Sequence, residues 1–139
     1  MYLLDTPAFS ETRRRLMAAG YVRFLQTVPP QMMFTSSVVV GELWKGASGH
    51  PDAAQRATLV NWLTQRALQS VSGRILPVSI EVGERWGLIS GEAARRGTTL
   101  PVADAFIAAT ALVHGLIVVT RNEDDFRRCG VAVRNPWAE

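Results

Sequence analysis

Short apolar runs alternate with longer segments of helical period along almost the whole chain, and this alternation restricts the fold more than any other feature of the sequence. The runs that we expect to form β-strands are Tyr2–Leu4, Met32–Thr35, Ile75–Val78, Leu116–Thr120 and Val131–Arg134. When strands alternate with helices, each helix carries the chain back to the same end of the sheet, so that neighbouring strands run parallel. We therefore predict an α/β fold with a mostly parallel sheet of four to five strands flanked by helices. With 139 residues and no long linker, we expect a single domain over residues 1–139.

Between these strands, apolar residues recur at the three- and four-residue spacing of one helix face. The expected helices are Thr6–Ala19 (continuous or broken), Tyr21–Val28, Val38–Ala47, Ala53–Ser70, a helix capped by Ser79, Pro101–His114 and Asp124–Arg128. Ser36 or Ser37 is a natural N-cap for the third of them. Gly83, Gly87 and Gly91 recur every four residues on the helix after Ser79. Because glycine lowers the stability of a helix, we expect another backbone to approach that face closely.

Composition excludes several kinds of site. The single cysteine, Cys129, excludes an internal disulfide and a zinc site built on several thiolates. His50 and His114 lie far apart and do not have the spacing of a metal-binding pair. No apolar run reaches the ~20 residues that cross a bilayer, and the first residues lack the apolar stretch of a signal peptide, so we expect a cytoplasmic protein with no membrane partner. The net charge is +3 and Lys45 is the only lysine; this arginine-rich set permits an anionic partner without requiring one.

Three acidic residues lie in apolar surroundings, where a core is expected. Asp5 directly follows the strand Tyr2–Leu4, Glu42 lies in the apolar stretch Val38–Trp44, and Asp104 interrupts a helix that is apolar almost all round. An ionised carboxylate left unpaired in such surroundings costs several kcal/mol. Each residue also has a purely structural interpretation: Asp5 as a helix cap, Asp104 as a charge favoured by a helix N-terminus, and Glu42 as the partner of an arginine.

A fourth polar cluster, Thr120–Phe126, follows the strand Leu116–Thr120 and supplies the side chains of Asn122 and Asp125. It is either an ordinary polar turn or a further source of oxygen ligands at the carboxyl end of a strand, where α/β sheets place their functional crevice. Four oxygen-rich points at one sheet edge favour a hard divalent cation, Mg²⁺ or Mn²⁺. Such a cation activates water and stabilises charge on a phosphoryl group, which predicts hydrolysis of a phosphodiester in RNA or DNA.

At this point the sequence resembles a known family. The blocks Tyr2–Glu11, Ser37–Gly46, Leu100–Ala111 and Val119–Trp137 occur in the order found in the PIN-domain ribonucleases, specifically the VapC/FitB-type toxins of toxin–antitoxin pairs. The resemblance covers essentially the whole chain and implies one PIN domain that acts as an Mg²⁺- or Mn²⁺-dependent endoribonuclease.

The resemblance also implies roles for single residues. The catalytic set that it implies is Asp5, Glu42, Asp104, Asp125 and Asn122, with Asp5 and Asp104 as the metal ligands. In the implied mechanism, a metal-activated water attacks the RNA phosphorus in line. Replacing Asp5 by Asn is then expected to abolish cleavage and to leave the circular dichroism spectrum unchanged.

The sequence departs from the family pattern at two positions. Pro7 stands where many relatives have Asn, and Asn122 stands where some have Asp. These departures keep an alternative open: a catalytically degenerate PIN module that binds antitoxin or RNA without cleavage. A phosphatase of small substrates is a further alternative, disfavoured because Asp5 is not followed by an Asp-x-Asp arrangement.

The implied partners are a VapB/FitA-like antitoxin, an RNA substrate and a second copy of the chain. We expect the antitoxin to dock along Phe9–Val28, which is otherwise a helical hairpin packed on the core. The glycine-stepped helix Val82–Ala93 packs either in a homodimer interface or inside one subunit. Nothing in the sequence indicates which RNA is cut.

Overall fold

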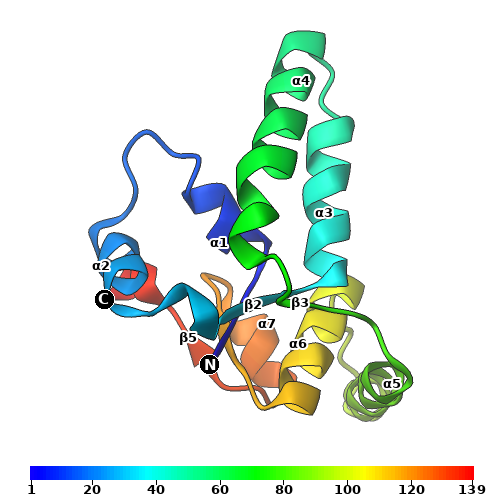
Figure 1. The fold of residues 1–139 in the computed structure, drawn as a ribbon. Coiled ribbons are helices and arrows are strands. Elements are labelled where there is room, and N and C mark those ends of the chain that lie inside the picture. The colour runs from blue at the N-terminus through cyan, green and yellow to red at the C-terminus, as the bar shows by residue number, and fades with distance from the viewer.

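The computed structural model describes all residues from 1 to 139 and contains one five-stranded sheet with the strand order β3-β2-β1-β4-β5 (Figure 1). The strands are β1 (Tyr2–Leu4), β2 (Met33–Ser36), β3 (Ile75–Leu76), β4 (Ile117–Val119) and β5 (Val133–Arg134). Every neighbouring pair is parallel. The predicted parallel α/β fold is therefore confirmed, with β1 at the centre of the sheet.

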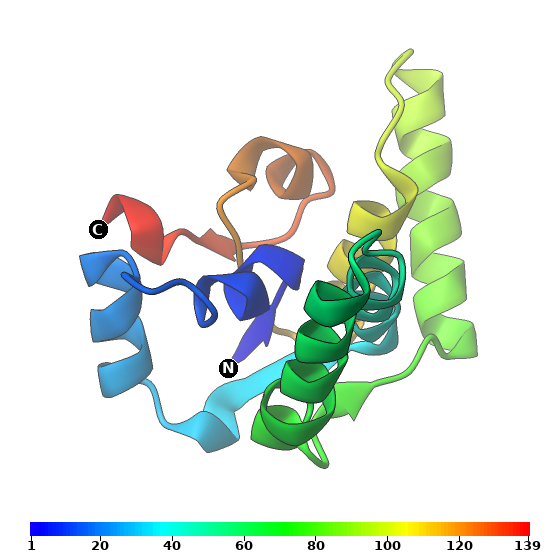
Figure 2. The same ribbon diagram turned by 90° about the horizontal axis from the view of Figure 1, so that it is seen from above.

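Seven α-helices surround this sheet. They are α1 (Thr6–Glu11), α2 (Ala19–Thr27), α3 (Ser37–Ser48), α4 (Ala53–Trp62), α5 (Ile80–Arg95), α6 (Val102–His114) and α7 (Glu123–Arg128). In Figures 1 and 2, α2 and α5 lie on opposite sides of the strands, and α3 and α4 form a hairpin that projects from the sheet. No helix is both long enough and apolar enough to span a bilayer.

Local hydrogen bonds explain where the helices begin and end. The Ser36 hydroxyl accepts the N–H of Val39 at the start of α3, and the Ser79 hydroxyl accepts the N–H of Val82 at the start of α5. Helix α6 ends at Gly115, whose φ of 66° lies in the left-handed region that glycine adopts at little cost. The two serine caps fix the strand-to-helix junctions after β2 and β3, and Gly115 fixes the turn from α6 into β4.

Two of the expected helices are shorter than predicted. The helix expected over Thr6–Ala19 ends at Glu11, so the prediction of a continuous helix up to Ala19 is wrong. Residues 12–18 form a loop in which Leu16 is 85% exposed. The three consecutive arginines of this loop give the segment no apolar face to pack. The helix expected over Ala53–Ser70 ends as α4 at Trp62 and continues as a π-helical turn, Leu63–Ala67.

The three glycines spaced four residues apart on α5 were expected to let another backbone approach closely, and no such approach occurs within the subunit. A Cβ added at Gly83, Gly87 or Gly91 meets no atom within 4 Å, so no backbone of this chain packs against that face. The core instead forms where both faces of the central strands are covered: Leu3 and Val118 are fully buried, together with Ala108 of α6. Helix α6 crosses this core, as its almost continuous apolar sequence predicted.

Candidate active site

Three acidic side chains from distant segments line one hollow of about 300 Å³: Asp5, Glu42 and Asp104. Asp5 follows β1, Glu42 lies in the second turn of α3 after β2, and Asp104 lies in the first turn of α6. Asn122, which follows β4, lines the same hollow. The carboxyl ends of the parallel strands β1 and β4 meet at one edge of the sheet, which is why residues more than 100 positions apart come together here.

Asp5 is the most buried acid of the hollow, with only 3% of its surface exposed. Its Oδ1 accepts the N–H of Ala8 at 3.1 Å and caps α1, so the prediction that Asp5 caps a helix is confirmed. Burial raises the pKa of Asp5 to about 7, because hydrogen bonds from Thr120 and Ala8 offset only part of the desolvation and the charges of Asp104 and Glu42 add to it. A cap alone does not require two further carboxylates nearby.

Glu42 is held by a hydroxyl rather than by an arginine. The Thr6 Oγ1 donates to Glu42 Oε1 at 2.6 Å, which joins the first residue of α1 to α3. None of the three acids of the hollow makes an ion pair within 4.0 Å. The interpretation of Glu42 as an arginine's partner is therefore wrong.

Asn122 joins two acids through its side-chain amide. Its Nδ2 donates to Asp125 Oδ2 at 2.7 Å and to Asp104 Oδ2 at 3.3 Å. Burial and the negative charges of Glu42 and Asp125 raise the pKa of Asp104, against the lowering effect of the Asn122 amide. Asp125 thus belongs to the same network, and its other oxygen lies 3.6 Å from Arg128.

The side chains of the hollow fit a hard divalent cation in their chemistry. All of the polar groups that face it carry oxygen acceptors, and the uncompensated charge around Asp5 is what a cation would neutralise. No group of three or more acidic, histidine or cysteine side chains forms a ready-made metal cluster. Mg²⁺ is usually bound by only one or two carboxylates together with water and substrate phosphate, so Asp5 and Asp104 suffice for such a site.

A second, larger concavity of about 600 Å³ lies between the N-terminal helices and the end of α4. Phe9, Tyr21 and Leu25 line it, and all three lie in the segment Phe9–Val28, where a docking groove was expected. Trp62 and Arg66 also line it, and the sequence analysis did not predict their part in the groove. Of the Phe9–Val28 segment, Tyr21 and Phe24 are core residues, so the interpretation as helices packed on the core is confirmed, and docking of an antitoxin stays a prediction.

Sequence reasoning also missed Glu11 and Thr6. Glu11 is 2% exposed, and its Oε1 accepts the N–H of Ala18 at 2.8 Å, which closes the loop that follows α1. Thr6 orients Glu42, as described above. A threonine next to Asp5 was visible in the sequence, but its partner is 36 residues away and no local pattern connects the two.

Known proteins of similar sequence and structure cover the whole chain. A family profile described as "PIN domain" matches residues 2–131. Toxin FitB of Neisseria gonorrhoeae is 34% identical over 137 residues, 99% of each chain, and VapC ribonuclease Y4jK of Sinorhizobium fredii is 28% identical over 137 residues, 99% of this chain and 98% of that protein. The crystal structure of FitAcB from Neisseria gonorrhoeae matches with a TM-score of 0.91 and 34% identity over 100% of both chains. The structure of FitAB bound to an IR36 DNA fragment matches with a TM-score of 0.89 and 32% identity, covering 99% of this chain and 96% of that chain.

Proposed function

Because this chain belongs to the PIN-domain family, we propose that it is a ribonuclease toxin of a toxin–antitoxin pair and that it cuts RNA with the help of Mg²⁺ or Mn²⁺. The observation that carries the proposal is the convergence of Asp5, Glu42 and Asp104 on one hollow without any cationic side chain to pair them. The relatives named as VapC ribonucleases and the toxin FitB support the assignment to an RNA-cutting toxin.

Asp5 and Asp104 are the residues that would hold the metal ion, directly or through water. A bound Mg²⁺ or Mn²⁺ supplies a more acidic water and a positive charge that stabilises a phosphoryl group. Glu42 and Asp125 complete the acidic surroundings, each held by a neutral donor: the Thr6 hydroxyl and the Asn122 amide. These donors fix the orientation of the carboxylates without cancelling their negative charge.

Asn122 and Pro7 shape the hollow. The Asn122 amide keeps the Asp104 and Asp125 side chains close together, although two carboxylates repel each other. Pro7 lies in the first turn of α1 and lines the hollow with an apolar ring. Its ring adds no polar group to this wall, whereas an asparagine would.

We assign the groove of about 600 Å³ to the antitoxin. Its lining is mostly apolar and includes Phe9, Tyr21 and Trp62, with Arg13 and Arg66 beside them. Arg13 lies over the Trp62 ring, 5.2 Å from its centroid, so its charge stays at the edge of the groove. An amphipathic segment with acidic residues at its border fits this surface, and one similar structure is described as a toxin–antitoxin complex from Klebsiella pneumoniae.

We assign the exposed face of α5 to a second copy of the chain. Ile80 and Leu88 are 82% and 71% exposed there, on the helix that carries the uncovered glycines. Apolar side chains beside glycines allow two helices to approach closely. Size-exclusion chromatography with light scattering is expected to give a dimer, and a monomer at micromolar concentration would refute this assignment.

RNA cleavage tests the proposed activity. The purified chain, with Mn²⁺ added, is expected to cut single-stranded RNA, and EDTA is expected to stop the reaction. Asp104→Asn is expected to lower the rate at least a hundredfold, whereas Asp124→Asn, the same change at an exposed acid outside the hollow, leaves it unchanged.

The degenerate binding module remains the second candidate, because the Asn122 amide occupies a position that a fourth acid would otherwise hold. A folded chain that binds RNA or an antitoxin and cuts nothing with either metal would establish it. Turnover of a small phosphomonoester with intact RNA left untouched would indicate a phosphatase instead.

A further inference from the structure

A basic hollow lies beside the acidic one and has no role in the account so far. Its volume is about 360 Å³, and its lining consists of Arg96 and Arg128 together with Ala93, Thr98 and Leu100. The hollow contains two guanidinium groups and no acidic side chain. It therefore offers a place for a negatively charged group close to the candidate active site.

A continuous row of polar contacts connects the two hollows. Arg128 lies 3.6 Å from Asp125, Asp125 accepts the Asn122 amide, and the same amide donates to Asp104. Leu100, in the wall of the basic hollow, is four residues before Asp104 in the chain. A strand of RNA that leaves the acidic hollow in this direction would pass directly over the two arginines.

The arginines are available for a ligand. Arg96 pairs only with Glu92, and Arg128 only with Asp125, and all four side chains keep substantial contact with solvent. Exposed ion pairs of this kind contribute little free energy, so a phosphate can displace them. The guanidinium group binds two phosphate oxygens at once, which an ammonium group does not.

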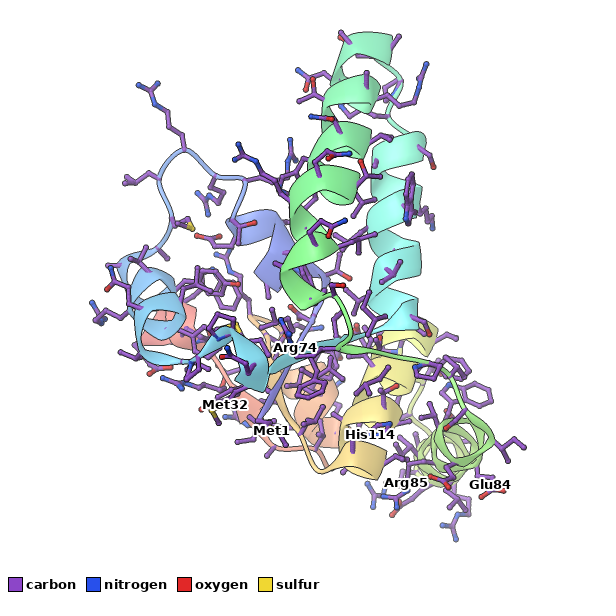
Figure 3. The ribbon with its side chains drawn as sticks, in the orientation of Figure 1. Met1, Met32, Arg74, Glu84, Arg85 and His114 are labelled. Atoms are coloured by element: carbon purple, nitrogen blue, oxygen red, sulfur yellow. The ribbon has the colours of Figure 1, made fainter.

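A third hollow, on α5, differs in the charge of its lining. Arg85 lines it together with two acidic residues, Glu81 and Glu84. Figure 3 shows Glu84 and Arg85 on α5 near His114, the last residue of α6, whereas Asp104 lies in the first turn of that helix. That hollow is at the wrong end of α6 to receive the substrate.

We propose that Arg96 and Arg128 bind a backbone phosphate of the RNA strand next to the phosphodiester that is cut. The proposal rests on the proposed function and adds to it the residues that hold the substrate. An acidic active site repels the polyanion that it must bind, and a cationic group beside it offsets this repulsion. Because a backbone phosphate is the same in every nucleotide, this contact raises affinity for all sequences alike.

RNA binding tests the proposal separately from cleavage. Asp5→Asn serves as a background that does not cut, and the probe is a fluorescein-labelled single-stranded RNA of 20 nucleotides, measured by fluorescence anisotropy with Mg²⁺ present. The matched control for Arg96→Ala/Arg128→Ala is Arg85→Ala/Arg95→Ala, which removes the same charge from exposed positions on α5.

The double variant at the hollow is expected to bind RNA about tenfold more weakly than the background, and the control variant less than twofold more weakly. Loss of this phosphate contact on a single strand also reduces the slope of log K against log[salt] by about 0.7. Arg96→Ala alone is expected to give about half of this reduction in slope. It leaves Asp125 untouched, so its effect does not come from a disturbed active site.

Glu92→Gln tests the same hollow in the opposite direction. It frees Arg96 from its present partner and is expected to tighten RNA binding two- to threefold. Equal RNA affinity of the hollow variant and the control variant would overturn the inference. It would also be overturned if the hollow bound inorganic phosphate but replacing its two arginines left the RNA affinity unchanged. Cleavage of RNA by the unmutated chain is measured in parallel, and its absence would instead overturn the proposed function.

Discussion

Replacing Asp5 by Asn is expected to stabilise the folded chain at neutral and alkaline pH. Burial and the nearby charges raise the pKa of Asp5 from 3.8 to about 7, so the fold holds its proton more tightly than the unfolded chain does. The stability that this protonation contributes is fully present below pH 3.8 and is lost as the pH rises through about 7. The two pKa values differ by about 3, which corresponds to about 4 kcal/mol at 1.36 kcal/mol for each pH unit.

Asparagine preserves what Asp5 does for the backbone. Its side-chain oxygen can still accept the Ala8 N–H that caps α1, while the charge that the hollow disfavours is removed. Compared with the wild type, the variant is therefore expected to gain up to about 4 kcal/mol in unfolding free energy between pH 4 and pH 8.

The assay is urea unfolding followed by circular dichroism, at a series of pH values and with EDTA present. The difference in unfolding free energy between the variant and the wild type is the measured quantity, because it cancels the titration of all other groups. Mg²⁺ at pH 8 is expected to stabilise the wild type and not the variant. A difference that stays constant from pH 4 to pH 8 would refute the reasoning about the buried charge.

Four further variants test stability and metal binding. Glu11→Gln is expected to lower the unfolding free energy by about 2 kcal/mol, measured by urea unfolding, because a buried charged acceptor of a backbone N–H becomes a neutral one. Gly20→Ala is expected to cost about 3 kcal/mol or more, since its Cβ would overlap the carbonyl oxygen of Pro136. Gly46→Ala, where the added Cβ meets nothing, is expected to stabilise α3 by up to about 1 kcal/mol in the same assay. Asn122→Asp is expected to lower the melting temperature in EDTA and to increase the rise that Mn²⁺ produces, because a fourth carboxylate of the hollow replaces an amide donor.

Much of the fold follows from local pattern. The five strands and the starts of α3 and α5 were predictable because short apolar runs and serine caps act over a few residues. The end of α1 was not, because the loop that follows it is closed by a hydrogen bond from the Ala18 N–H to Glu11, seven residues earlier, and no local pattern indicates this bond. The two alternatives for the glycines of α5 could not be separated from the sequence, because it does not indicate whether a helix face meets its own chain or another; the structure excludes only packing inside the subunit.

The acidic residues of the candidate site could be predicted from the sequence, but the hydrogen bonds that hold them could not. A carboxylate in an apolar segment is costly wherever it lies, so Asp5, Glu42 and Asp104 stood out individually. The Thr6–Glu42 and Asn122–Asp104 hydrogen bonds depend on how distant elements pack, and no local pattern predicts them. The same limit applies to the basic hollow, whose arginines come from α7 and from the end of α5.

The most direct test of the account is a crystal of this chain soaked in Mn²⁺ and measured for anomalous scattering. The account predicts one strong peak in the hollow between the carboxylates of Asp5 and Asp104, about 2 Å from each oxygen that binds the ion directly. A well-ordered crystal at high Mn²⁺ concentration with no peak between these two side chains would contradict it.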